Sequence, residues 1–171
     1  EGISLDDKLA VTRHLSAAGA NIEELNTVRK QLSRIKGGGL WRACRSGRLV
    51  TLVISDVIGD DLQTIASGPT LEDRSTPSEA LAILKKYNAR AAGIGDHVLA
   101  YLRNKTDRGM PRPTATAWHF IIGNLATAVD AAGREAELMG YEPAVQTATA
   151  REGPAEEIGV HLAELALSMR D

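Results

Sequence analysis

Three aspartates within six residues are the most chemically informative feature of this 171-residue sequence. Asp56, Asp60 and Asp61 follow residues 49–54, an almost continuous β-branched and apolar run. Such a run predicts a strand buried on both faces of a parallel sheet, and ligands of open parallel sheets bind beyond the carboxyl ends of the strands. Clustered carboxylates bind magnesium, and one of them could accept the proton of an attacking hydroxyl. We predict catalytic roles for Asp56 and Asp60 and metal binding by all three, with helix capping as the alternative for Asp60 and Asp61.

A segment of small residues, 65–70, comes shortly after the aspartates. It contains Ser67, Gly68 and Thr70, whose hydroxyls can donate hydrogen bonds and whose glycine permits close approach of the backbone to a ligand. We expect these three residues to contact substrate or nucleotide, although taken alone the segment is an ordinary turn.

A polar stripe occupies one face of the helix predicted after Asn21. Asn26, Arg29, Ser33 and Lys36 recur at helical spacing, roughly opposite an apolar stripe that runs from Ile22 to Ile35 and is expected to be buried. Arg29 and Lys36 could hold anionic oxygens, the arginine through two parallel hydrogen bonds. A solvated helix face is the alternative.

Three consecutive glycines, residues 37–39, follow that helix. A phosphate-binding loop normally opens a helix, so that the amides of the helix N-terminus point at the anion. Here the glycines close a helix, and a C-cap is their default interpretation. Gly37 and Gly38 remain candidates for phosphate binding only if residues 40–44 begin a new helix.

The remaining pattern alternates between strands and helices. Capping residues and apolar spacing predict helices and strands whose order favours an α/β fold, a partial Rossmann-like parallel sheet covered by helices and spanning parts of two α/β domains. The predicted helices cover residues 4–18, 21–36, 77–87, 97–103, 125–139 and 156–169, and the predicted strands cover residues 49–54, 118–122 and 144–147.

The linker candidate is the segment 105–114, which is rich in proline and glycine. It divides the chain into residues 1–104, part of an N-terminal Rossmann-like domain, and residues 115–171, the start of a second α/β unit. We expect these two parts to pack separately, an expectation that fails if the strands near Val53 and Ile121 pair in one sheet.

Composition excludes several classes of function. The net charge of −2 argues against an obligate nucleic-acid partner, because such sites need clustered lysines and arginines. No apolar run is long enough to cross a bilayer, which predicts no membrane partner. The single cysteine, Cys44, cannot form an internal disulfide and favours a reducing, cytoplasmic location.

Several segments together resemble the glycerate 2-kinase family, whose members carry a C-terminal domain named for its MOFRL motif. The likeness covers nearly the whole chain and is most specific over residues 55–70. The matching segments are residues 2–8, 26–30, 33–38, 55–61, 65–70 and 121–124, followed by the alanine-rich helix that ends at Gly140-Tyr141. The sequence departs from the family near residues 151–155, where an acidic residue is expected directly after Gly153.

The resemblance implies a kinase that uses ATP and Mg²⁺ to phosphorylate glycerate, with its active site between two α/β domains. It favours Arg29 and Lys36 as anion contacts over the solvated-face alternative. It also implies longer proteins, with an upstream half-domain and the MOFRL domain itself, so that this chain corresponds to their middle. We therefore expect the isolated chain to be inactive, and we expect exposed sheet edges to favour homo-oligomers.

Two other functions remain open. A nicotinamide-dependent reductase of hydroxypyruvate predicts a complete glycine fingerprint after a strand, whereas the sequence offers only Gly93-Ile94-Gly95. A module that binds sugar phosphates or nucleotides without turnover is the non-catalytic alternative.

Overall fold

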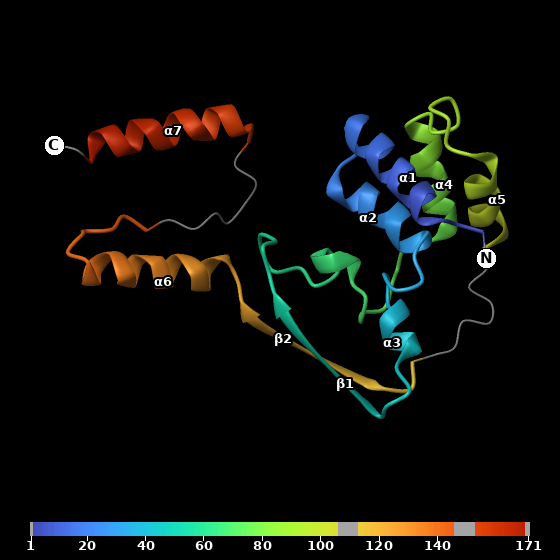
Figure 1. Cartoon of the computed structure of the whole chain (residues 1–171), viewed down its shortest axis with the longest axis horizontal. Helices are drawn as coiled ribbons and strands as arrows, with labels where there is room; N and C mark the ends of the chain where they lie inside the picture. Colours follow the sequence, from blue (N-terminus) through green and yellow to red (C-terminus); the bar gives the residue numbers. More distant parts are fainter. Residues whose placement is uncertain (1, 106–112, 146–152, 170–171) are drawn as a thin grey trace. The chain divides into compact units, whose positions relative to one another are not determined.

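The computed structural model describes residues 2–105, 113–145 and 153–169. Its contacts divide the chain into two compact units. Unit 1 contains Glu1–Ile54 and Asp61–Ile122, and unit 2 contains Ser55–Asp60 and Gly123–Asp171. Within the described residues the fold is α/β, as predicted, with one parallel pair of strands and helices on either side of it in sequence (Figure 1).

The helices of unit 1 begin where the sequence predicts. Ser4 caps α1 (Leu5–Ala17), Asn21 caps α2 (Ile22–Gln31) and Thr76 caps α4 (Pro77–Lys86), each in a reciprocal capping box with the acidic residue three positions on. The remaining helices of this unit are α3 (Gly39–Ala43), the 3₁₀ turn η1 (Ile65–Ser67) and α5 (Asp96–Asn104).

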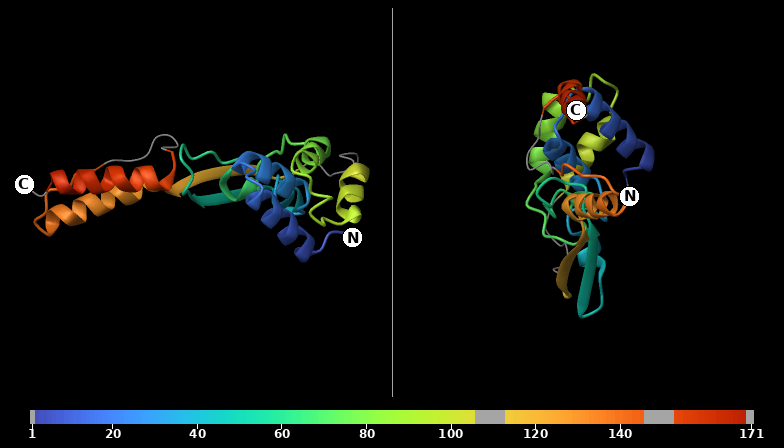
Figure 2. Two further views of the ribbon diagram at one scale, coloured as in Figure 1. Left: turned by 90° about the horizontal axis from the view of Figure 1, so that it is seen from above. Right: turned by 90° about the vertical axis from the view of Figure 1, so that its left-hand side faces the viewer.

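The core of unit 1 lies among four of these helices. α2 packs against α1 and α4, and α4 packs against α5. Figures 1 and 2 show the four helices gathered together in every view. Val28 of α2, Leu84 of α4 and Leu102 of α5 are all at most 1% exposed in this cluster. The burial of these apolar side chains is the main favourable contribution to the stability of the unit.

The two strands, β1 (Arg48–Ile54) and β2 (Thr116–Gly123), pair with each other in parallel. The Thr116 amide donates to the Gly47 carbonyl at 3.1 Å, next to the start of both strands, and the Ser55 amide donates to Gly123 at 2.9 Å, at the end of both. The expectation that residues 115–171 pack apart from residues 1–104 is therefore wrong for β2. The predicted linker falls mostly on residues 106–112, which lie outside the described residues.

β1 is less buried than its composition predicts. Val53 is buried, but Val50, Leu52 and Ile54 are 59%, 63% and 77% exposed. The prediction of burial on both faces is wrong for this chain, because only one side of the strand is covered by described residues of unit 1. A continuous apolar run indicates what a strand can bury, and the neighbours present decide what it does bury.

Unit 2 consists mainly of two helices at their predicted positions, α6 (Leu125–Leu138) and α7 (Ala155–Ser168). The spacing of its apolar residues predicts that one face of α7 is buried, but Leu162 and Met169 are 56% and 55% exposed. Ala144 and Val145 do not form the predicted strand, and the rest of that segment lies outside the described residues. No described helix of either unit has the length and apolar character needed to span a membrane.

Candidate functional site

The polar residues of α2 do not form the single helical stripe predicted from their spacing. α2 ends at Gln31, so Ser33 and Lys36 lie beyond it, and Ile35 of the predicted apolar stripe is 61% exposed. Asn26 is buried and accepts a hydrogen bond from the Ser67 hydroxyl at 2.9 Å. This buried contact joins α2 to the small-residue segment 65–70, two of the segments that the sequence singled out.

The segment 65–70 forms a left-handed turn. Ala66, Ser67 and Gly68 have φ values of 52°, 63° and 56°. In L-residues this conformation brings Cβ into a steric clash. Ala66 and Ser67 are therefore strained, and contacts with the surrounding residues must stabilise them. The Ser67–Asn26 bond is one restraint, and the Lys36 ammonium, which donates to the Ala66 carbonyl at 2.9 Å, is another. Strain of this kind is concentrated at functional sites.

The glycine segment runs alongside this turn. The amides of Gly37 and Gly38 donate to the carbonyls of Ser67 and Gly68 at 3.0 and 2.8 Å. A Cβ on Gly38 would lie 2.5 Å from the Leu71 carbonyl oxygen, so only glycine fits. The short helix α3 does follow, as the phosphate-loop interpretation requires, but both amides already bind the protein. Gly37 and Gly38 therefore support the turn in this structure.

A polar cluster next to Gly37, of which Gln31 is buried and the other members are partly exposed, was not predicted from the sequence. The side-chain amide of Gln31 donates hydrogen bonds to the Asp73 carboxylate at 3.1 Å and to the Ser75 carbonyl at 2.8 Å. The Lys30 ammonium lies 3.8 Å from the same aspartate, and a Cβ on Gly37 would lie 2.7 Å from its carboxylate oxygen. Gln31 and Asp73 are 42 residues apart, and no local sequence pattern indicates that they meet.

Three cationic side chains line one cavity of about 240 Å³ between α1 and the end of α2. They are Lys8, Arg29 and Lys36, and no acidic residue from the described part of the chain lines this cavity. None of the ion pairs among the described residues involves any of the three. Burial, and secondarily the charge of Arg29, lower the pKa of Lys36. A concave site with uncompensated positive charge suits a small anion. Lys8 was not among the predicted site residues.

Thr70 lies at a different place in unit 1. Its hydroxyl is 2.9 Å from the His119 Nε2 and accepts a hydrogen bond from the Thr51 hydroxyl at 3.2 Å. Thr70 thus connects the turn to β1 and β2. Its role is to anchor the segment 65–70 to the sheet, and His119 joins it through a contact that the sequence did not predict.

Asp61 caps the turn that follows it, as the alternative interpretation of the sequence states. Its carboxylate accepts hydrogen bonds from the Thr64 hydroxyl at 2.6 Å and from the backbone N–H of Gln63 at 3.0 Å. The Thr64 hydroxyl is the main cause of the lowered pKa of Asp61. Across residues 2–105, 113–145 and 153–169, the histidine, cysteine and acidic side chains form no group of three that could hold a metal ion.

Asp60 belongs to unit 2 and contacts Asn124. The side-chain NH₂ group of Asn124 donates a hydrogen bond to the Asp60 carboxylate at 2.7 Å. The side-chain oxygen of Asn124 caps α6 by accepting a hydrogen bond from the backbone N–H of Thr127 at 3.0 Å. Interactions with the Ser55 hydroxyl and then with Asn124 lower the pKa of Asp60, which favours the ionised carboxylate. Asp56 is exposed two residues beyond the end of β1. In the segment that follows β1, the Asp60 carboxylate is therefore oriented by Asn124, and its lowered pKa favours the ionised form.

The comparisons with known proteins agree on one family. A family model described as a domain of unknown function, DUF4147, matches residues 1–103. A glycerate 2-kinase of Pyrococcus horikoshii is 35% identical over 96% of this chain and 38% of its own length. A putative hydroxypyruvate reductase of Agrobacterium vitis is 42% identical over 99% of this chain and 37% of its own length.

A solved structure supports the same relationship at the level of the fold. The crystal structure of a glycerate kinase from Thermotoga maritima matches with a TM-score of 0.64 and 38% identity, over 82% of this chain and 32% of that one. The chain spans only about a third of the length of these relatives. From the match to its family domain and from these identities, the chain belongs to the glycerate kinase family.

Proposed function

We propose that the chain forms part of a glycerate 2-kinase, which transfers the γ-phosphoryl group of ATP to the 2-hydroxyl of glycerate. The observation that carries the proposal is the cavity lined by Lys8, Arg29 and Lys36, three cations without an acidic partner among the described residues. Glycerate and the phosphates of ATP are anions, and the names of the Pyrococcus and Thermotoga relatives identify glycerate as the acceptor of those enzymes.

In this proposal each residue of the cavity has a role that follows from its chemistry. Arg29 offers a planar fork that matches a carboxylate or phosphate with two hydrogen bonds. Lys36 provides a point charge, held in place by its bond to the Ala66 carbonyl. The strained turn that positions this lysine contains Ser67 and Gly68 and is bonded to Asn26. Gly37 and Gly38 bond to the backbone of the turn, and Thr70 anchors its end to β1.

The carboxylates serve the acceptor and the metal in this proposal. Phosphoryl transfer depends on positioning and charge stabilisation, and an aspartate commonly accepts the proton of the attacking hydroxyl. Asp60, ionised and oriented by Asn124, suits this role. Mg²⁺ binds one or two carboxylates together with substrate phosphates, so Asp56 would hold the metal while Asp60 accepts the proton. Asp61 fits less well, because both of its oxygens already accept hydrogen bonds.

The Agrobacterium relative names a second candidate, reduction of hydroxypyruvate. A dinucleotide fingerprint lies between a strand and a helix. Gly93 and Gly95 instead lie in a turn that follows α4, and α5 begins at Asp96. This geometry favours the kinase. Oxidation of NADH or NADPH by the chain in the presence of hydroxypyruvate would favour the reductase.

The test uses the purified 171-residue chain. We expect it to bind D-glycerate or ATP weakly without turnover in an ADP-release assay with magnesium, because it spans about a third of its relatives and a reacting group misplaced by about 1 Å can cost ~10²-fold. Binding should weaken in Arg29→Gln and not in Arg13→Gln on the exposed face of α1. Turnover that Asp60→Ala abolishes would show a complete site, whereas binding indifferent to Arg29 would contradict the proposed anion site.

The proposal includes a cytoplasmic location, which a single cysteine favours, and self-association through the exposed parts of β1. A sedimentation measurement on the chain tests the second point. A chain that stays monomeric at high concentration would contradict it.

A further inference from the structure

A second hollow of unit 1 lies between α4 and α5, away from the candidate site described above. Its volume is about 520 Å³, within the roughly 300–1,000 Å³ typical of small-molecule sites. Its floor is apolar and belongs to the helical core, since Leu84, Ala89 and Leu99 are 1%, 1% and 8% exposed. It shares no residue with the cavity of Arg29 and Lys36.

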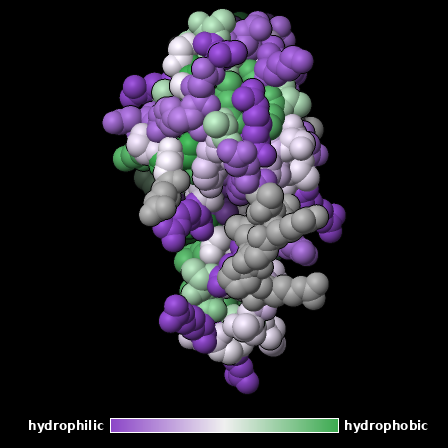
Figure 3. All heavy atoms as spheres, turned by 90° about the vertical axis from the view of Figure 1, so that its right-hand side faces the viewer, coloured by the Kyte–Doolittle hydropathy of each residue, from purple (hydrophilic) through white to green (hydrophobic). Residues whose placement is uncertain are grey.

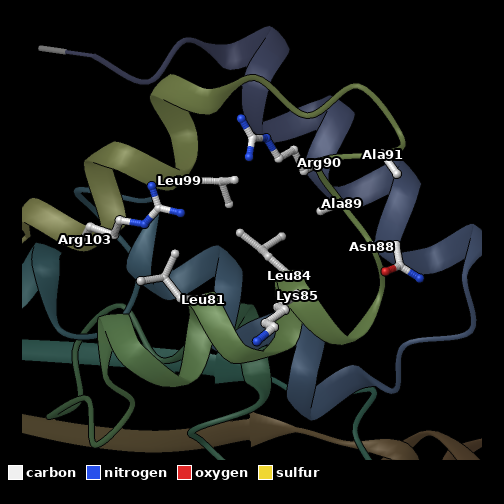
Figure 4. Close-up of a pocket in the computed structure, with 9 residues that line it drawn as sticks. All are labelled: Leu81, Leu84, Lys85, Asn88, Ala89, Arg90, Ala91, Leu99 and Arg103. Carbon is white, nitrogen blue, oxygen red and sulfur yellow. The ribbon is translucent and has the colours of Figure 1, made fainter.

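The rim of this hollow carries charge of one sign. Lys85, Arg90 and Arg103 line it, and none of its described lining residues is acidic. Figure 4 shows the guanidinium groups of Arg90 and Arg103 on two sides of the Leu99 side chain, above Leu84. Arg90 is paired with Asp96 at 3.0 Å. The side chains of Lys85 and Arg103 make no hydrogen bond or ion pair with another described side chain.

An apolar floor beneath unpaired cations selects a particular class of ligand. The floor offers burial to a hydrocarbon body, and the Arg103 fork offers two parallel hydrogen bonds to a carboxylate. Figure 3, which views the molecule from the side of α5, shows hydrophobic surface between hydrophilic side chains. We propose that the hollow between α4 and α5 binds a small amphipathic carboxylate, with its apolar body on Leu84 and Leu99 and its head group on Arg103.

This site goes beyond the proposed kinase function and does not depend on it. Among the described residues, the two cavities have no lining residue in common. The two sites can therefore be tested one at a time in the same chain.

The experiment is calorimetric titration of the full chain with octanoate, acetate and 1-octanol. We expect saturable binding of octanoate to one site, and binding at least about tenfold weaker for acetate, which lacks the tail, and for octanol, which lacks the charge. Arg103→Gln should weaken octanoate binding by about tenfold through loss of the charge-assisted hydrogen bonds. Arg13→Gln is the matched control, because it removes an exposed arginine of α1 and should change nothing.

A second variant guards against an indirect effect of charge. Ala91 is exposed and lines the hollow, so Ala91→Trp should fill it without disturbing the core and should abolish octanoate binding. Absence of saturable octanoate binding, or binding that survives both Arg103→Gln and Ala91→Trp, overturns the proposal. Equal binding of octanol and octanoate also overturns it, since the cations would then have no role.

Discussion

In unit 1 the side chains of four helices close over one another, whereas in unit 2 the two long helices leave almost every side chain in contact with solvent. The described part of unit 2 buries only Ser55 and Gly133, and α7 has no buried residue at all. Both units have well-formed helices with caps or favourable N-termini. Local signals therefore determine where a helix forms, while burial of its apolar face determines how stable it is.

The strongest test of this difference is the same substitution in both units. Leu84→Ala removes a side chain that is 1% exposed in the core of unit 1, and it should reduce the free energy of unfolding by about 2–5 kcal/mol. Leu167→Ala in α7 removes one that is 64% exposed, and its effect should stay within about 0.5 kcal/mol. Urea denaturation of both variants measures the two values. Equal losses would show that unit 2 has a core of its own.

A smaller effect is expected where α2 meets the strained turn. Asn26→Ala leaves the buried Ser67 hydroxyl without its acceptor and should cost about 1–3 kcal/mol of stability. Asn104→Ala, at the exposed end of α5, is the matched control and should change stability by less than about 0.5 kcal/mol. If the two asparagines proved equivalent in urea denaturation, the Asn26–Ser67 bond would not be what holds the turn to α2.

The strain itself predicts opposite signs for one substitution at two alanines. Ala66 has a φ of 52°, so Ala66→Gly relieves a steric clash and should raise stability by up to about 1 kcal/mol after the entropy of glycine is taken into account. Ala82→Gly lies in the exposed interior of α4 and should lower stability by about 1 kcal/mol. Thermal unfolding of both variants gives the two signs. A loss of stability at both positions would mean that Ala66 is not strained.

The smallest effect concerns a surface contact that links α2 to α4. Lys86, and then the Tyr87 hydroxyl at 2.6 Å, lower the pKa of Glu24 to about 2 from its ordinary value of 4.5. A depressed carboxyl pKa stabilises the fold above the unfolded value, and this contribution disappears as the pH falls from 4.5 towards 2. The stability of Glu24→Gln should therefore vary less with pH in this range. Parallel pH profiles of the wild type and the variant would contradict the contact.

Much of the fold follows from local sequence signals. Ser4, Asn21, Thr76 and Asn124 cap helices where their sequence context predicts, because a cap depends on residues only three positions apart. The burial of β1 and α7 was predicted wrongly, because burial depends on neighbours that a local pattern does not contain. The pairing of β1 with β2 was not predicted for the same reason, since these strands are separated in the sequence by α4 and α5.

The candidate site shows the same limit. The spacing of Asn26, Arg29 and Lys36 drew attention to them, but Asn26 and Lys36 are connected through the turn at Ser67, 41 residues from Asn26. Lys8 was overlooked because it is on a different helix and its spacing has no meaning in isolation. The capping alternative for Asp61 depends on residues two and three positions away, and the hydrogen bonds of Asp61 to Gln63 and Thr64 match it. Contacts distant in sequence are the part of the site that residue spacing alone does not predict.

The most direct test of the kinase proposal is a chimaera in which this chain replaces the matching segment of the Thermotoga maritima glycerate kinase, to which it is 38% identical. The chimaera should release ADP in the presence of D-glycerate and ATP. Arg29→Gln should raise KM, Asp60→Asn should lower kcat by about 10²-fold or more, and Asp56→Asn should do the same if Asp56 binds metal. Arg13→Gln should alter neither constant. An active chimaera with unchanged constants in Arg29→Gln and Asp60→Asn would contradict the proposed roles of these residues.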